Sequence, residues 1–62
     1  MKTQPVRRYV AQIGDTVHYF KSKAEPGTVG TVRPLGRPVR VRLTDTYHSY
    51  HRAFVADRVD FL

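Results

Sequence analysis

Apolar and polar residues alternate along several short segments of this chain, whereas the three- and four-residue spacing of an amphipathic helix is nearly absent. The alternation is strictest over residues 39–43, where three apolar side chains would share one face of a strand and two arginines the other. β-branched and aromatic residues over 16–20 and 28–33 each follow a glycine-containing turn signal and predict two further strands. The pattern therefore predicts an all-β fold.

Weaker signals extend this prediction to the rest of the chain. The turn-rich segment 34–38 would join the two strands that flank it into a hairpin. We expect another strand over 50–55, a single 3₁₀ turn over 56–58 and a last short strand over 59–62, while residues 7–11 form either an edge strand or a loose arm. About five antiparallel strands joined by short turns favour a small closed or half-open β-barrel.

The predicted barrel occupies most of the chain. We divide the sequence into a basic N-terminal arm or edge strand over residues 1–11 and a barrel over residues 12–62. The side chains expected in the barrel core are Val17, Tyr19, Val29, Val32, Val39, Val41, Leu43 and Phe54. Phe54 shares its strand parity with Arg52, so an inward Phe54 requires either that Arg52 lies at the rim or that a β-bulge shifts the register.

Composition narrows the class of protein. The 62 residues suffice for one small domain, and 11 Lys and Arg against 5 Asp and Glu give a formal net charge of +6. Without cysteine, the domain has neither a disulfide nor a thiolate zinc site. No stretch reaches the roughly 20 apolar residues of a membrane span, and no apolar segment follows the basic start. We therefore expect a cytoplasmic protein without a signal peptide or a membrane contact.

Two groups of small barrels share motifs with this chain. Two segments read Gly14-Asp15-Thr16-Val17 and Gly27-Thr28-Val29-Gly30-Thr31-Val32. They resemble the G-D-x-V and G-x-x-G-x-V pattern of KOW-type SH3-like barrels, whose members contact RNA or protein in ribosomal proteins and transcription elongation factors. Three further segments read Val29-Gly30-Thr31-Val32, Pro38-Val39-Arg40-Val41-Arg42-Leu43 and Phe54-Val55-Ala56-Asp57-Arg58-Val59. These resemble the photosystem I reaction-centre subunit IV type barrels. Both resemblances imply an SH3-like barrel and support the fold more than any activity.

Four arginines are concentrated around the predicted hairpin: Arg33, Arg37, Arg40 and Arg42. Arg40 and Arg42 would lie on one exposed face, with the other two near the turn. Guanidinium groups suit bidentate contacts with phosphate or carboxylate groups, and five acidic residues spread over turns would do little to neutralise this face. The alternative is that the arginines solvate an exposed strand and discourage edge-to-edge pairing. We favour a functional basic patch.

The segment 44–52 interleaves hydroxyl, aromatic, imidazole and guanidinium groups, including Tyr47, His48, Tyr50, His51 and Arg52. Unpaired bases stack on such rings, and hydroxyl groups bond phosphates or base edges. The alternative interpretation is a hairpin loop whose tyrosines cover the open end of a small core, and both can hold because a capping ring often keeps one face in water.

Metal binding and catalysis find little support in the sequence. His48 and His51 are three residues apart, which would place them on opposite faces of a strand, and no cysteine completes a site. Asp45 near His48 is typical of turn chemistry rather than of a catalytic pair. We therefore expect a protein that is not an enzyme and has no cofactor.

The sequence predicts a non-catalytic module that binds nucleic acid, either RNA or DNA, through the arginine-rich strand face and the Tyr/His loop. A basic arm formed by Lys2, Arg7 and Arg8 either follows the nucleic-acid backbone or has no role. The alternative is a docking or assembly subunit whose basic face binds an acidic protein. A chain this short also makes a homo-oligomer possible, since a partner would bury further surface.

Overall fold

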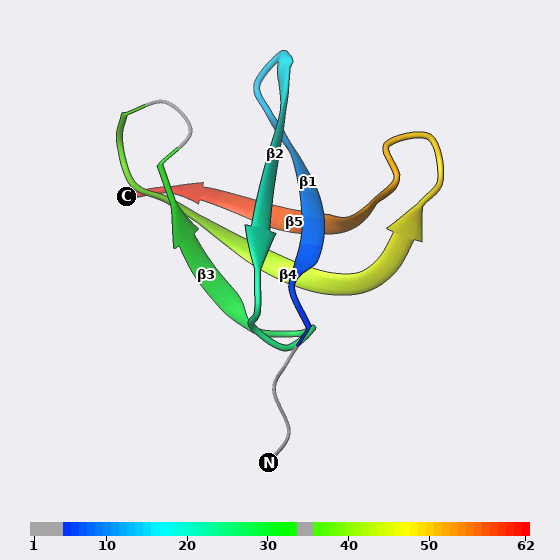
Figure 1. The fold of residues 1–62 in the computed structure, drawn as a ribbon. Helices are drawn as coiled ribbons and strands as arrows, with labels where there is room; N and C mark the ends of the chain where they lie inside the picture. Colours follow the sequence, from blue (N-terminus) through cyan, green and yellow to red (C-terminus); the bar gives the residue numbers. More distant parts are fainter. Residues whose placement is uncertain (1–4, 34–35) are drawn as a thin grey trace.

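Five strands form a single curled sheet in the computed structural model, which describes residues 5–33 and 36–62 (Figure 1). The strands are β1 (Arg7–Ile13), β2 (Thr16–Ser22), β3 (Val29–Val32), β4 (Val39–His48) and β5 (Ala53–Phe61). Their order across the sheet is β2-β1-β5-β4-β3. The β1–β2 hairpin rises steeply from the layer of β4 and β5, so the sheet curls into a half-barrel with β2 and β3 at its edges (Figure 1).

The pairing of the first strand with the last is parallel. Tyr9 lies opposite Phe54 and Val10 opposite Val55, with β1 and β5 running in the same direction. The other three pairings, β1–β2, β3–β4 and β4–β5, are antiparallel, as expected for consecutive strands with short connections. The prediction that all strands are antiparallel is therefore wrong for β1 and β5. Turn signals report only on strands that follow each other along the chain, and these two are far apart in sequence.

The prediction that residues 7–11 form an edge strand or a loose arm is also wrong. β1 lies inside the sheet between β2 and β5, and Tyr9, Ala11 and Ile13 are buried in the core. The division at residue 11 therefore cuts through a central strand. Residues 1–4, and Lys2 with them, lie outside the described residues, as do Pro34 and Leu35 of the predicted hairpin turn.

The C-terminal third forms one long strand instead of the predicted strand, 3₁₀ turn and short strand. Residues 49–52 form a turn, and β5 continues from Ala53 to Phe61 without interruption. Arg58 has a φ of 51°, and the register with β4 shifts between Arg40 and Arg42, so a β-bulge occupies the place of the predicted turn. A second shift lies between Leu43 and Tyr47 on β4, and Arg52 lies exposed in the turn. Neither shift lies between Arg52 and Phe54, so the position of Arg52 outside the strand resolves the Phe54 parity conflict.

The core confirms part of the predicted set. Val39, Val41 and Leu43 are at most 1% exposed, and Val32 and Phe54 pack against the buried cluster. The prediction is wrong for Tyr19 and Val29, which are 48% and 57% exposed, and for Val17, which lies half-buried on the outer face beside Gln12. The segment 16–20 is apolar on both parities, so alternation alone does not decide which face turns inward. Pairing of Phe20 with the buried Tyr9 decides it.

No helix capable of spanning a membrane occurs among residues 5–33 and 36–62.

Candidate functional site

The turn between β4 and β5 gathers three aromatic rings. Arg52 has a φ of 54°, and the Arg52 N–H donates a hydrogen bond to the Ser49 carbonyl at 3.2 Å. The chain therefore reverses its direction within this turn. The His51 ring lies 4.8 Å from the His48 ring and 5.0 Å from the Tyr50 ring, measured between centroids. Tyr50 is 84% exposed, so most of its ring is open to a ligand.

Tyr19 connects the turn to the outer face of the β1–β2 hairpin. The Tyr19 hydroxyl and His51 Nδ1 are 2.8 Å apart and share a hydrogen bond. The Arg8 guanidinium lies 4.7 Å from the centroid of the Tyr19 ring, on its face. Lys21 lies opposite Arg8 in the ladder and is exposed. A continuous row of cations and rings thus crosses from β1 and β2 to the turn.

We call this row the aromatic–basic surface, and define it as Arg8, Tyr19, Lys21, Tyr50, His51 and Arg52. A shallow hollow of about 230 Å³ lies within it, lined by Arg8, Tyr19, Phe20 and Lys21. Of the residues that the structure describes, two cations and two aromatic rings line the hollow, and no carboxylate does. Sequence analysis placed Arg8 in a basic arm and Tyr19 in the core, and it did not single out Lys21. Only the register of β1 with β2 and the Tyr19–His51 hydrogen bond bring these residues to the turn.

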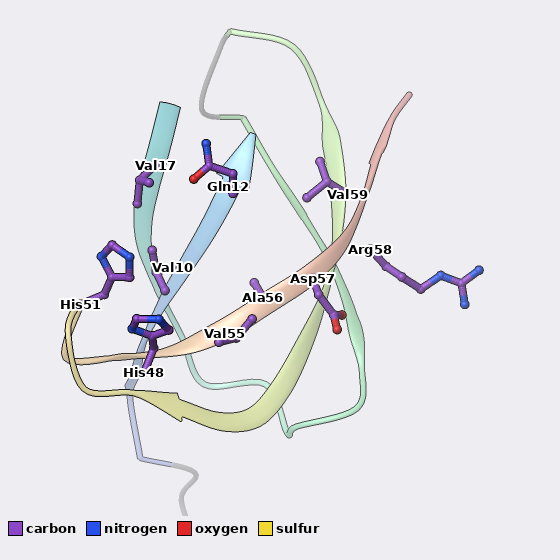
Figure 2. A pocket seen from close by; sticks show the side chains of 10 residues that line it. All are labelled: Val10, Gln12, Val17, His48, His51, Val55, Ala56, Asp57, Arg58 and Val59. Carbon is purple, nitrogen blue, oxygen red and sulfur yellow. The ribbon is translucent and has the colours of Figure 1, made fainter. Parts of the chain in front are cut away.

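Next to this surface is a groove of about 370 Å³ between the β1–β2 hairpin and β5. It opens because β1 and β5 pair only at two positions, the second of which is Val10 with Val55, and then diverge. Figure 2 shows the rings of His48 and His51 on the side of the groove where Val10 and Val55 lie. Gln12 lies at the other end, and its amide nitrogen donates to the Gly14 carbonyl at 2.8 Å.

The arginines of the predicted basic patch do not form one unneutralised face. Arg42 donates two hydrogen bonds of 2.9 Å to the carboxylate of Asp57, which raises the pKa of Arg42 and lowers that of Asp57. Arg40 is exposed and lies opposite Asp60 in the ladder. The expectation that acidic residues lie only in turns is therefore wrong, since the C-terminal segment is a strand that places two aspartates beside the arginines.

The other two predicted arginines, on either side of the connection between β3 and β4, contact different groups. The Arg37 guanidinium packs on the Phe61 ring at 4.8 Å from its centroid. Arg33 follows β3 and lines a hollow with Ile13 and His18. All four arginines lie toward the start of β4, whereas the Tyr/His turn follows the end of this strand (Figure 1). The two predicted halves of the site are thus at opposite ends of β4.

Tyr47 belongs to a different cluster from the rest of its loop. Its ring meets Phe54 edge-on at 5.2 Å between centroids, and Arg7 lies 4.2 Å from the Phe54 centroid. Arg7 also donates to Asp45 at 2.8 Å, and this hydrogen bond raises the Arg7 pKa. Tyr47 therefore packs on Phe54 at the edge of the core, whereas Tyr50, which the alternative interpretation also placed over the core, is 84% exposed.

The placement of His48 and His51 differs from the expected opposite faces, because a turn rather than a strand follows His48. Within the part of the chain that the structure describes, no three His, Cys, Asp or Glu side chains come together as metal ligands.

Comparisons with protein-family models, with curated proteins and with solved structures find no match for this chain.

Proposed function

We propose that this chain is a non-catalytic nucleic-acid-binding module, and that the aromatic–basic surface makes the contact. The observation that supports this most strongly is the row in which Arg8 lies over Tyr19 and Tyr19 holds His51, next to the exposed ring of Tyr50. Nucleic-acid strands bind to surfaces that combine exposed rings with cations, because bases stack on the rings while phosphates approach the cations.

The exposure of each group indicates its role in binding. Tyr50, at 84% exposed, is the stacking platform, and Arg8, Lys21 and Arg52 are the exposed cations of the same surface. The hydrogen bond to Tyr19 holds the His51 ring in place before any ligand arrives, which lowers the entropic cost of binding. Contacts of this kind give affinity that falls with salt and little sequence discrimination.

We also propose that the half-barrel is of the SH3-like class. Gly14 and Gly27 have φ values of 63° and 87°, and they provide the left-handed turns in the two glycine motifs that resemble the KOW pattern. The strand number agrees with this class, whereas the parallel β1–β5 pair differs from the all-antiparallel barrel expected.

The test is a fluorescence anisotropy titration of a short single-stranded oligonucleotide with the wild type and the Tyr50→Ala variant. Loss of a base-stacking ring costs about 1–3 kcal/mol, so the affinity should fall by about 5- to 150-fold. Three phosphate-contacting cations predict a slope of log K against log salt of about −2. Because the Tyr50 ring is mostly exposed, the variant should keep the wild-type thermal unfolding transition.

A pair of charge variants provides the control. Arg8→Gln and Arg40→Gln each remove one positive charge, but only Arg8 lies in the aromatic–basic surface. We expect Arg8→Gln to weaken binding more than Arg40→Gln and to reduce the magnitude of the salt slope by about 0.7. Equal losses would instead support the arginine face predicted from the sequence. Binding of polyglutamate as tight as that of the oligonucleotide, and unaffected by Tyr50→Ala, would favour an acidic protein partner.

A further inference from the structure

We propose that the groove between the β1–β2 hairpin and β5 holds an unstacked nucleobase, so that the protein binds single strands in preference to duplexes. The inference rests on the proposed function and assigns to the groove a separate task from phosphate contact and from stacking on Tyr50. It concerns the groove lined by Val10, Gln12, Val17, His48, His51 and Val55, together with the neighbouring part of β5.

The groove has the size and the lining of a small-ligand site. Its volume of about 370 Å³ lies within the range of about 300–1,000 Å³ that such pockets occupy. Side chains of Val10, Val17 and Val55 line it with apolar surface, and the paired positions of Val17 with Gln12 and Val55 with Val10 place them on the same outer face of the sheet. Val10 is only 6% exposed although it faces away from the core, so the floor is already screened from water.

Two imidazole rings provide an aromatic surface for contact with a base. His48 and His51 lie together at the end of the groove nearest the turn, with 4.8 Å between their centroids (Figure 2). The hydrogen bond to Tyr19 fixes the His51 ring. Flat π-surfaces beside apolar side chains favour a planar, polarisable ligand such as a base.

Gln12 gives this site a hydrogen-bonding group. Because its amide nitrogen is engaged by the Gly14 carbonyl, its carbonyl oxygen is the acceptor left for a ligand. An N–H group on a base edge complements such an acceptor. Asp57 also lines the groove, but its carboxylate is bonded to Arg42, and Figure 2 shows Arg58 pointing away from the groove.

The position of the groove explains why the ligand is a base of a bound strand rather than a free apolar molecule. His51 belongs both to the groove and to the aromatic–basic surface, so a strand whose phosphates approach Arg8 and Lys21 passes beside the groove. A base in a duplex is paired and stacked and would have to be extruded first, at a cost of a few kcal/mol in general. Single strands avoid this cost.

The experiment is an NMR titration of the whole chain, with valine methyl signals as the readout. The probes are a short oligothymidylate and an abasic strand with the same number of phosphates. We expect the oligothymidylate, but not the abasic strand, to shift the Val10, Val17 and Val55 methyl signals. The Val29 methyl signals, on the outer face of the far edge strand, should stay unchanged with both probes.

A matched pair of variants then tests the groove by affinity. Val17→Phe fills the groove and should weaken binding of the oligothymidylate by at least about fivefold, the lower limit for loss of one stacked base. It should leave binding of the abasic strand unchanged. Val29→Phe makes the same substitution at an exposed site and should match the wild type with both probes.

The outcomes separate the two proposals. If the oligothymidylate binds and shifts the Tyr50 ring signals, but the groove methyl signals do not move, the groove proposal is overturned and the proposed function stands. Equal affinity of the wild type for oligothymidylate and for a duplex of the same length would also overturn it. If neither the oligothymidylate nor the abasic strand binds at low salt, the proposed function itself fails, and the groove proposal fails with it.

Discussion

The hydroxyl of Tyr9 is a buried polar group that we expect to destabilise the folded protein. Tyr9 is 0% exposed, and its ring stacks on Phe20 at 5.7 Å and contacts Phe54 at 6.2 Å between centroids. Its hydroxyl oxygen is buried and has no hydrogen-bond partner among residues 5–33 and 36–62, although Tyr9 is close enough to Arg7 to contribute, after Asp45, to the raised pKa of that guanidinium. Replacing Tyr9 by Phe removes this oxygen and keeps the ring contacts.

We expect Tyr9→Phe to stabilise the protein. A buried polar group without a partner costs about 1–3 kcal/mol, and the low end applies here because a cation is nearby. A gain of about 1 kcal/mol is large for a chain of 62 residues, whose total stability is about 3–9 kcal/mol. It corresponds to a rise in Tm of about 4–8 °C for a domain of this size.

The assay is thermal and urea unfolding followed by circular dichroism, with Tyr19→Phe as the matched control. Tyr19 loses the same atom, but its hydroxyl is hydrogen-bonded to His51, so this variant should not gain stability. A loss of about 1 kcal/mol or more in Tyr9→Phe would refute the reasoning, because it would mean that the Tyr9 hydroxyl makes a favourable hydrogen bond in the folded protein.

Two further predictions concern the sheet itself. Leu43→Ala should lower the free energy of unfolding by about 2–5 kcal/mol in urea titrations because Leu43 is 1% exposed, whereas Val29→Ala, at a site 57% exposed, should change it by less than about 0.5 kcal/mol. Hydrogen bonds from Arg42 lower the pKa of Asp57 below its ordinary 3.8, so the stabilisation is present at neutral pH and is lost as the pH falls through the folded-state pKa. The difference in stability between the wild type and Asp57→Asn should therefore be positive at pH 7 and shrink in acid, and a difference that grows in acid would contradict this.

Local patterns assigned the inward face of a strand correctly where only one parity is apolar. The segment 39–43 alternates strictly, and its valines and Leu43 lie in the core as predicted. The segment 16–20 does not alternate, and Tyr19 was placed on the wrong face. The basic character of Arg7 and Arg8 concealed a central strand, because the aliphatic and aromatic residues that follow them carry the core contacts.

The sequence by itself determined the all-β class, the positions of β2, β3 and the start of β4, and the residue types of the candidate site, because these depend on side-chain alternation and on turn chemistry within a few residues. Only the tertiary structure decided which of these residues meet. The parallel β1–β5 pairing, the ion pair between Arg42 and Asp57 and the contact of Tyr19 with His51 join residues 15 to 45 positions apart along the chain. Such contacts arise from the register of a curled sheet, and no local pattern specifies them.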